Sequence, residues 1–138
     1  MKPTSVNSFI DTNILIYLLS LDSKKKDIAR TFLSNHNLIS TQVVNEYCNI
    51  CLKKFNLSTS DTQETLISIT QRVQVCNIDL DTIFLALKIK HKYKYQYYDS
   101  LIIASAIENK CSILYSEDLQ HNQIVDNKLK ILNPFVAV

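Results

Sequence analysis

Short apolar runs alternate with longer amphipathic segments along this chain. Residues 38–40 are apolar enough for a buried strand, whereas residues 42–55 repeat apolar side chains at the spacing of a helix. The predicted strands are residues 6–10, 38–40, 73–78, 112–115 and 129–132. The predicted helices are residues 13–20, 23–35, 42–55, 60–73, 81–92 and 99–110. The helix at residues 60–73 opens with Ser60-Asp61-Thr62-Gln63, which has the pattern of a capping box.

This alternation predicts an α/β fold. Strands that alternate with helices form a parallel sheet that helices cover on both faces. We therefore expect a central parallel sheet of four to five strands, and we find no linker, internal repeat or low-complexity tract. In such sheets ligands bind beyond the carboxyl ends of the strands. Polar residues that directly follow a strand are therefore the first candidates for a functional site.

The composition excludes several classes of protein. The 138 residues suit one domain, and the net charge of +2 is too small to indicate a nucleic-acid partner by itself. The chain has no glycine, which excludes glycine-rich phosphate loops of the Walker and dinucleotide-binding types. The apolar run at residues 14–19 is far shorter than the roughly 20 residues that span a bilayer. We expect no membrane segment or signal peptide, and four cysteines without an export signal favour free thiols in the cytoplasm.

Four acidic residues fall where this fold would form a site. Asp11 directly follows the first predicted strand, and Asp118 follows the fourth. Asp99 opens the last predicted helix, and Glu46 lies about one turn inside the third helix, beside its apolar face. Because the carboxyl ends of parallel strands share one edge of the sheet, we expect these acids to reach that edge together.

Each acid taken alone also has a structural explanation. Asp11 and Asp99 could cap the helices that follow them. Asp118 could lie in a turn, and Glu46 could be a solvated helix charge. Together they are harder to explain, because two like charges ~4 Å apart repel by about 4 kcal/mol at an effective dielectric near 20. A cluster of carboxylates needs protons or a cation, and an all-oxygen set without His or Cys favours Mg²⁺ or Mn²⁺.

The order and the flanks of these acids resemble the PIN-domain family, and within it the VapC-type toxins of bacterial toxin–antitoxin pairs. The resemblance covers nearly the whole chain. The matching segments are Phe9-Ile10-Asp11-Thr12-Asn13, Glu46, Tyr98-Asp99-Ser100 with Ile103-Ala104-Ser105-Ala106, Ser116-Glu117-Asp118-Leu119-Gln120 and Asn133-Pro134-Phe135. One departure is Asn122, where similar proteins often carry glycine. Asparagine adopts left-handed backbone geometry at modest cost, so the loop can keep its shape.

The resemblance implies a single PIN domain over residues 1–138, with a three-layer α/β/α fold and a Mg²⁺- or Mn²⁺-dependent endoribonuclease activity. The family's metal-binding and catalytic acids match Asp11, Glu46, Asp99 and Asp118. The amide and the hydroxyl that support them match Asn13 and Ser116. The resemblance also implies an RNA substrate, a homodimer, and a cognate antitoxin whose tail enters the active-site groove. Either Glu46 or Asp118 could accept a proton from the attacking water.

Basic and aromatic residues alternate just before Asp99. Lys90, Lys92 and Lys94 are candidate phosphate contacts, and the neighbouring tyrosines could stack on unpaired bases. The same stretch could instead be a solvated helix end whose tyrosines anchor a loop.

The segment Cys48-Asn49-Ile50-Cys51 has the CxxC spacing of zinc and redox sites. No second pair and no nearby histidines complete a zinc site. Both cysteines fall on the apolar face of the predicted helix, where cysteine behaves as a small hydrophobic residue. We therefore expect them to pack in the core.

Two other α/β protein classes that use acidic residues do not fit this sequence. A phosphotransfer receiver domain would need adjacent acids near the first strand and a lysine after a later strand, and this chain has neither. A haloacid-dehalogenase-like phosphatase would need an acid two residues after its nucleophile, where this chain has Asn13. A PIN-like module that binds RNA or a protein without cutting is the alternative from another class. Metal-dependent cleavage of RNA distinguishes it from the nuclease.

Overall fold

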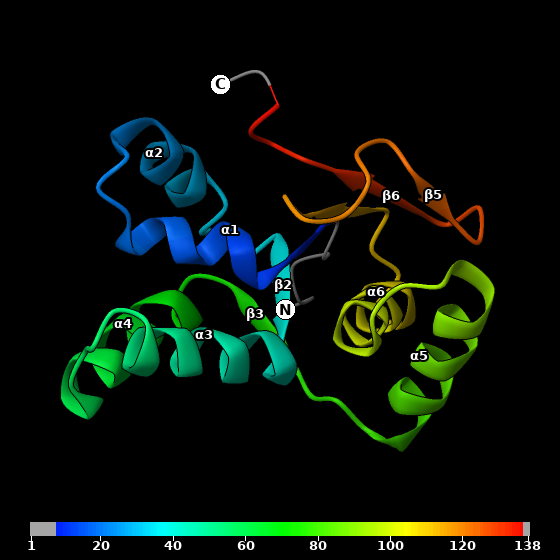
Figure 1. Ribbon diagram of the computed structural model, residues 1–138, viewed down its shortest axis with the longest axis horizontal. Helices are drawn as coiled ribbons and strands as arrows, with labels where there is room; N and C mark the ends of the chain where they lie inside the picture. The colour runs from blue at the N-terminus through cyan, green and yellow to red at the C-terminus, as the bar shows by residue number, and fades with distance from the viewer. Residues whose placement is uncertain (1–7, 137–138) are drawn as a thin grey trace, which may run out of the picture.

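The computed structural model describes residues 8–136 (Figure 1). Its strands are β1 (Ser8–Ile10), β2 (Asn37–Ser40), β3 (Gln74–Cys76), β4 (Ile113–Tyr115), β5 (Ile124–Val125) and β6 (Leu129–Leu132). Its α-helices are α1 (Thr12–Ile16), α2 (Ser23–Thr31), α3 (Thr41–Lys53), α4 (Thr59–Thr70), α5 (Leu80–Tyr93) and α6 (Tyr97–Glu108). A 3₁₀ helix, Tyr17–Leu19, continues α1. The first two residues of the strand predicted at 6–10 lie outside the described residues.

The strands form one sheet in the order β3-β2-β1-β4-β6-β5. All neighbouring strands pair in parallel except β5, which pairs antiparallel with β6. The predicted α/β fold is confirmed, and within residues 8–136 the sheet has six strands where four to five were expected. The additional strand is β5, which has two residues and therefore no alternating pattern that a sequence could display.

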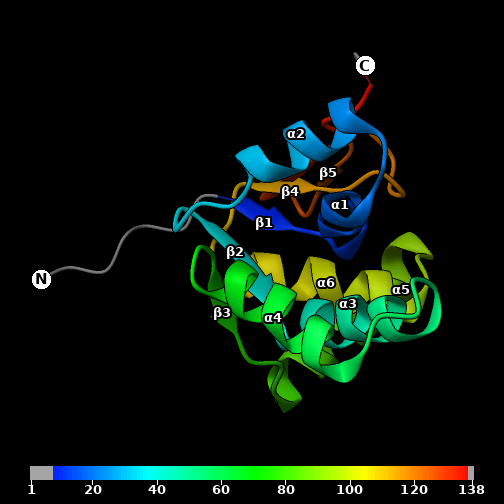
Figure 2. The same cartoon turned by 90° about the vertical axis from the view of Figure 1, so that its left-hand side faces the viewer.

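Helices cover both faces of this sheet. Figure 2 shows α2 above the strands and α5 and α6 below them. The helix α6 is apolar nearly all round, and residues 100–106 are all buried, as expected for a helix in the centre of a layer. Phe9 and Ile10 of β1 are also fully buried, so the central strand of the sheet is covered on both faces. Among residues 8–136, each helix is too short or too polar to span a lipid bilayer.

Side-chain caps fix where several helices begin, and one predicted cap is wrong. The capping box expected at Ser60 does not form, because α4 begins at Thr59 and Ser58 is its N-cap. The Ser58 hydroxyl accepts a 3.0 Å hydrogen bond from the backbone N–H of Asp61. A capping box instead opens α5, where the Asp79 side chain and the N–H of Thr82 lie 3.1 Å apart and the reciprocal bond is 3.3 Å.

Turns are made without glycine. Within residues 8–136, six non-glycine residues have positive φ, and four of them are asparagine or aspartate, which tolerate left-handed geometry best: Asn56, Asn122, Asp126 and Asn127. Asn122 has φ 70°, which is the left-handed geometry expected at a position where similar proteins often carry glycine. Asp126 and Asn127 are consecutive and connect β5 to β6, which is the backbone pattern of a tight hairpin turn.

Candidate active site

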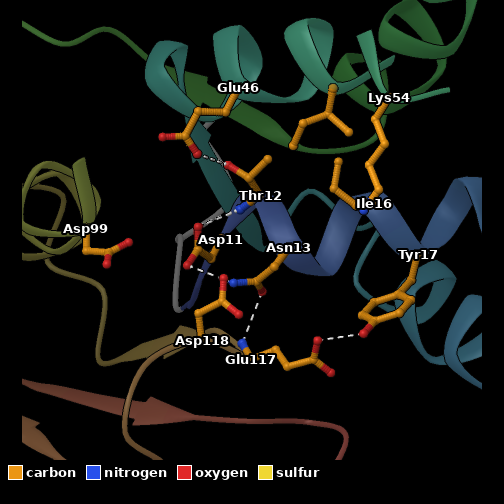
Figure 3. Close-up of a pocket in the computed structure, with 11 residues that line it drawn as sticks. Asp11, Thr12, Asn13, Ile16, Tyr17, Glu46, Lys54, Asp99, Glu117 and Asp118 are labelled. Carbon is orange, nitrogen blue, oxygen red and sulfur yellow. Dashed lines mark hydrogen bonds between the residues drawn. The ribbon is translucent and has the colours of Figure 1, made fainter. Parts of the chain in front are cut away.

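A cavity of about 350 Å³ contains all four predicted acids on its lining (Figure 3). Asp11 follows β1, Glu46 lies on α3, Asp99 on α6, and Asp118 in the loop after β4. The four side chains therefore come from four separate segments of the sequence. In Figure 3 they gather at one side of the cavity, while Lys54 and Tyr17 lie at the other. The sheet thus brings together the acids that were predicted to meet.

The register of the sheet places Asp11 beside Ser116. Ile10 of β1 pairs with Tyr115 of β4, so the next residue of each strand emerges at the same edge. The Ser116 hydroxyl donates a 2.8 Å hydrogen bond to Oδ2 of Asp11. Ser116 is fully buried, and its partner is 4% exposed. This contact joins residues 105 positions apart and follows directly from parallel pairing.

Asp11 also caps α1, as one of its structural explanations predicted. Its Oδ1 accepts a 2.7 Å hydrogen bond from the N–H of Thr12, and Oδ2 accepts a 3.2 Å bond from Nδ2 of Asn13. Asn13 in turn contacts the Ser116 hydroxyl at 3.3 Å, and its Oδ1 accepts a bond from the N–H of Glu117 at 3.0 Å. Asn13 therefore joins the loop after β1 to the loop after β4.

The charge state of Asp11 is strongly perturbed. The pKa of Asp11 is raised from 3.8 to about 7, mainly by burial and in smaller part by the neighbouring charges of Asp99 and Glu46. The hydrogen bonds from Ser116 and from the Thr12 N–H act in the opposite direction, because they stabilise the carboxylate. A buried acid among other acids binds either a proton or a cation. A cap alone does not account for this environment.

Asp99 lies in the first turn of α6, and it is not the N-cap, which is Gln96. Because α6 leads into β4 and runs back along the sheet, its N-terminus reaches the carboxyl edge of the strands. Burial raises the pKa of the Asp99 carboxyl, and the charges of Asp118 and Glu46 add to this effect. The carboxylates of Asp99 and Asp118 accept no hydrogen bond from any group in the described part of the chain, so their oxygens remain available to a ligand.

Glu46 is held differently. The end of β2 at Ser40 caps α3, and its hydroxyl accepts a 3.3 Å hydrogen bond from the N–H of Val43. One turn later, the Glu46 carboxylate accepts a 2.6 Å bond from the Thr12 hydroxyl and a 3.1 Å bond from Nε2 of Gln42. Both of its oxygens therefore have a protein donor. Thr12 and Gln42 were not predicted, although Thr12 lies inside the motif that carried the resemblance.

The donor set suits a hard divalent cation. All four acids offer oxygen, which Mg²⁺ and Mn²⁺ prefer. In residues 8–136, no three His, Cys, Asp or Glu side chains are grouped closely enough to form a ready-made metal cluster. Mg²⁺ usually keeps several of its waters and is held by one or two carboxylates, so it does not need such a cluster. The shared cavity and the perturbed pKa of Asp11 both fit this mode of binding.

A second polar cluster, which the sequence did not reveal, borders the same cavity. The Tyr17 hydroxyl donates a 2.5 Å hydrogen bond to Glu117, and Nζ of Lys25 contacts Glu117 at 3.2 Å and the Tyr17 hydroxyl at 3.0 Å. Burial and the bond to Glu117 raise the pKa of Tyr17, so its hydroxyl remains a donor at neutral pH. Nζ of Lys25 lies 4.7 Å from the centre of the Tyr17 ring, which packs on Phe135.

The predicted phosphate contacts lie outside the lining of the cavity. Lys92 forms a 2.9 Å ion pair with Asp126, and Nζ of Lys90 donates to the carbonyl oxygen of Tyr95 at 3.2 Å. Lys94 ends α5 with φ 65°. The lysine that does line the cavity is Lys54, directly after α3. No pattern in the sequence distinguished Lys54 from its neighbours.

Cysteine chemistry is not part of this site. Cys48 and Cys51 are both free thiols on α3. Cys51 is buried in the core, as the apolar face of the helix predicted, whereas Cys48 is only half-buried. Burial raises the pKa of both thiols, which disfavours the thiolate that zinc and redox chemistry require.

Comparison with known proteins identifies the family. A family model of the PIN domain matches residues 8–127. The chain therefore belongs to the PIN-domain family, and the resemblance found in the sequence is confirmed. No curated protein matches the chain.

Solved structures share the fold at low sequence identity. A toxin–antitoxin complex from Klebsiella pneumoniae has 22% identity and a TM-score of 0.72, over 94% of this chain and 98% of that one. A DNA-bound VapBC from Salmonella typhimurium has 16% identity and a TM-score of 0.70, over 91% and 96% of the two chains. VapC20 from Mycobacterium tuberculosis, described as a sarcin–ricin loop cleaving toxin, has 15% identity and a TM-score of 0.65, over 81% and 90%.

Proposed function

We propose that this protein is a Mg²⁺- or Mn²⁺-dependent endoribonuclease, and the VapC-type toxin of a toxin–antitoxin pair. The observation that carries the proposal is the convergence of Asp11, Glu46, Asp99 and Asp118 on one cavity. Membership of the PIN-domain family supports it, and so do structural neighbours described as toxins in complex with antitoxins or as an RNA-cleaving toxin. A divalent ion held there would neutralise charge on a phosphodiester and lower the pKa of a water molecule.

The four acids have different parts in this proposal. Asp11 and Asp99 hold the ion directly, because burial and neighbouring charges give both carboxyls an elevated pKa that a cation relieves. Asp118 and Glu46 would complete the set, either through water or through a second ion. Thr12 and Gln42 fix the direction of the Glu46 carboxylate, while Ser116 and Asn13 fix that of Asp11.

The RNA backbone passes along the cavity in this proposal. Lys54 lies on the wall away from the acids and offers a positive charge to a phosphate. Lys90, Lys92 and Lys94 form a second set of contacts beside the start of α6. Lys92 contributes least of the three, because it already pairs with Asp126.

The proposed partners follow from the same reasoning. In this proposal the protein is located in the cytoplasm and forms a homodimer. Residues 1–138 form a single PIN domain. Its antitoxin inhibits it by entering the groove that holds the acids.

The test is cleavage of total RNA by the purified chain with Mg²⁺, with Mn²⁺ and with EDTA. The variant Asp11→Asn removes one charge at nearly constant size. The matched control is Asp27→Asn, which changes an exposed aspartate in a surface ion pair. We expect discrete fragments that require metal, that persist in the control, and that are lost in Asp11→Asn. Cleavage by Asp11→Asn at the native rate and metal dependence would overturn the site. Absence of cleavage by folded, antitoxin-free protein would instead support the non-cutting binding module.

A further inference from the structure

A second cavity opens beside the one that holds the acids. Its volume is also about 350 Å³, and the two cavities share three lining residues, Ile16, Tyr17 and Lys54. Figure 3 shows these three residues on the side of the acid cavity away from Asp99. The two cavities therefore form one groove, which begins at the acids and continues past Lys54. A cavity of this volume is large enough for a small organic group.

The walls of the second cavity are mainly apolar. Its remaining lining residues are Leu19, Ser20, Leu21 and Phe55. The Ser20 hydroxyl accepts a 2.9 Å hydrogen bond from the N–H of Asp22, so it can still donate its own proton to an acceptor on a ligand. The Tyr17 hydroxyl already bonds Glu117. The polar groups that the cavity offers to a ligand are therefore the Ser20 hydroxyl and the Lys54 ammonium.

The end of α3 holds the aromatic ring of this cavity in place. Phe55 is half-buried and directly follows Lys54, the C-cap of the helix. Asn56 then has φ 52°, and the N–H of Leu57 bonds the carbonyl oxygen of Cys51 at 3.0 Å, which is a common way to close a helix C-terminus. Because this turn fixes the backbone around Phe55, its ring needs little further ordering when a flat ligand stacks on it.

Lys54 lies between the two cavities with its charge unpaired. Within residues 8–136 it forms no ion pair, and its Nζ lies 6.0 Å from the centre of the Phe55 ring. Lys25, which lies on the other side of Tyr17, is instead paired with Glu117 at 3.2 Å. Lys54 therefore offers its charge to an anion directly beside an apolar wall.

We propose that the second cavity binds one unpaired base of the RNA, and that Lys54 binds the phosphate next to the one held at the acids. The base stacks on the ring of Phe55, and Ser20 donates to an acceptor on the edge of the base. A single strand carries a flat base beside each phosphate, and the groove offers matching groups in the same order. Paired bases are stacked inside a duplex and cannot enter. The substrate is therefore single-stranded at this position.

The charge of Lys54 favours RNA over an apolar protein segment as the occupant. An apolar segment would cover the walls of the cavity but would leave the ammonium without a partner, which costs free energy when water is excluded. A nucleotide supplies both the apolar ring and the anion. The continuity of the cavity with the acids also places this nucleotide directly beside the phosphate to be cleaved.

The experiment measures the binding of two fluorescent RNA probes to the full chain in EDTA, by fluorescence anisotropy. One probe is a short oligoadenylate, and the other is a strand of the same length that lacks bases. We expect the oligoadenylate to bind about tenfold more tightly, which is the size of one base–aromatic stacking contact. Phe55→Ala should lose most of this preference. Phe55→Tyr keeps the ring and should retain it.

Lys54→Met tests the phosphate contact. It should weaken the binding of both probes by a similar factor, because the contact is with the backbone. It should also reduce the slope of log affinity against log salt concentration by about 0.7, the value for one phosphate on a single strand. The matched control is Lys53→Met, which removes an exposed lysine that lines neither cavity and should change both affinities much less. Circular dichroism checks that each variant remains folded.

The outcomes separate this inference from the proposed function on which it rests, because binding in EDTA requires neither metal nor cleavage. A chain that shows the expected preference but does not cut RNA would fail only the proposed activity. A chain that cuts RNA but binds neither probe, or binds both alike, would fail only the present inference. An unchanged preference in Phe55→Ala would overturn the base site, and the cavity would then suit a side chain of a protein partner. Equal effects of Lys53→Met and Lys54→Met would overturn the phosphate contact.

Discussion

The hydroxyl of Ser116 donates a 2.8 Å hydrogen bond to the carboxylate of Asp11, across two neighbouring parallel strands. The bond stabilises the ionised form of a carboxyl whose pKa burial raises to about 7. Ser116 therefore keeps Asp11 closer to the state that a cation needs. Its contribution should be visible as an effect of pH on metal binding.

Replacing Ser116 with alanine should weaken Mn²⁺ binding most strongly near neutral pH. Without the donated bond the pKa of Asp11 rises further, so a larger fraction of the carboxyl is protonated and competes with the metal. We expect the affinity near pH 7 to fall about tenfold, as for other residues that orient a metal ligand. The deficit should shrink as the pH is raised. Titration of Mn²⁺ by electron paramagnetic resonance at several pH values measures this.

Ser105→Ala is the matched control for this experiment. Ser105 is also a buried serine, but its hydroxyl donates to the backbone carbonyl of Leu101 within α6. It should leave metal affinity unchanged at each pH. A deficit in Ser116→Ala that is the same at all pH values would show that Ser116 does not act through the charge of Asp11.

The stability of the metal-free protein should decrease as the pH rises from about 4 to about 7. Folded Asp11 has a pKa of about 7 and its ordinary value is 3.8, so the folded state holds an extra proton in this window. Between these two values Asp11 is ionised in the unfolded chain and still protonated in the folded one, so the free energy of unfolding falls by about 1.4 kcal/mol per pH unit. The decrease ends above about pH 7, where both states are ionised. Asp99, whose pKa is also raised, adds to the slope.

Denaturant unfolding in EDTA at a series of pH values measures this slope. Asparagine cannot ionise, so Asp11→Asn should reduce the slope of the unfolding free energy against pH by up to the value for one proton. Saturating Mg²⁺ should stabilise the wild type more than the variant at pH 7 and above, by ligand linkage. A wild-type profile that is already flat, or that rises with pH, would contradict the charge state assigned to Asp11.

The acids could be predicted from the sequence because their positions follow from topology. Asp11 and Asp118 come directly after strands, and parallel strands end at one edge. Asp99 and Glu46 lie near the starts of helices that reach the same edge. The alternation of strands and helices is therefore enough to predict that all four acids lie at this edge, and no side-chain contact needs to be known.

The contacts that hold the acids could not be predicted in this way. The bond between Thr12 and Glu46 joins α1 to α3, and its formation depends on how closely those helices approach. The cluster of Tyr17, Lys25 and Glu117 similarly joins segments about 100 residues apart. Hydrophobic periodicity places a residue on a face, but it does not set such distances.

Tyr17 and Lys25 should support catalysis through Glu117. Glu117 lies between Ser116, which bonds Asp11, and Asp118, so holding it fixes the loop that carries both. Tyr17→Phe removes the 2.5 Å bond to Glu117 and keeps the ring that packs on Phe135. We expect cleavage to fall several-fold, with a small change in melting temperature.

A double-mutant cycle with Lys25→Met tests whether both residues act on the same group. Because each holds Glu117, the double variant should lose little more activity than either single variant. Lys24→Met on the same helix is the control, since this exposed lysine forms no ion pair within the described residues. Fully additive losses would show that the two residues do not act through Glu117.

The hydroxyl of Thr12 should determine the catalytic rate more than substrate binding. Its 2.6 Å bond to Glu46 directs a carboxylate that borders the cavity, and Gln42 holds the other oxygen of that carboxylate. Thr12→Val keeps the shape of the side chain and the backbone N–H that bonds Asp11, but it removes the donor. We expect kcat to fall by roughly 10- to 100-fold with little change in KM, by analogy with other residues that orient a catalytic group.

The conservative variant distinguishes orientation from packing. Thr12→Ser keeps the hydroxyl and loses the methyl group, so it should recover most of the lost kcat, although it packs less well than valine. Single-turnover cleavage of a defined RNA at saturating metal measures the chemical step directly. If Thr12→Val retained the native kcat, or if Thr12→Ser were as slow as Thr12→Val, the hydroxyl would have no part in directing Glu46. Glu46 would then be held by Gln42 and by its place on α3 alone.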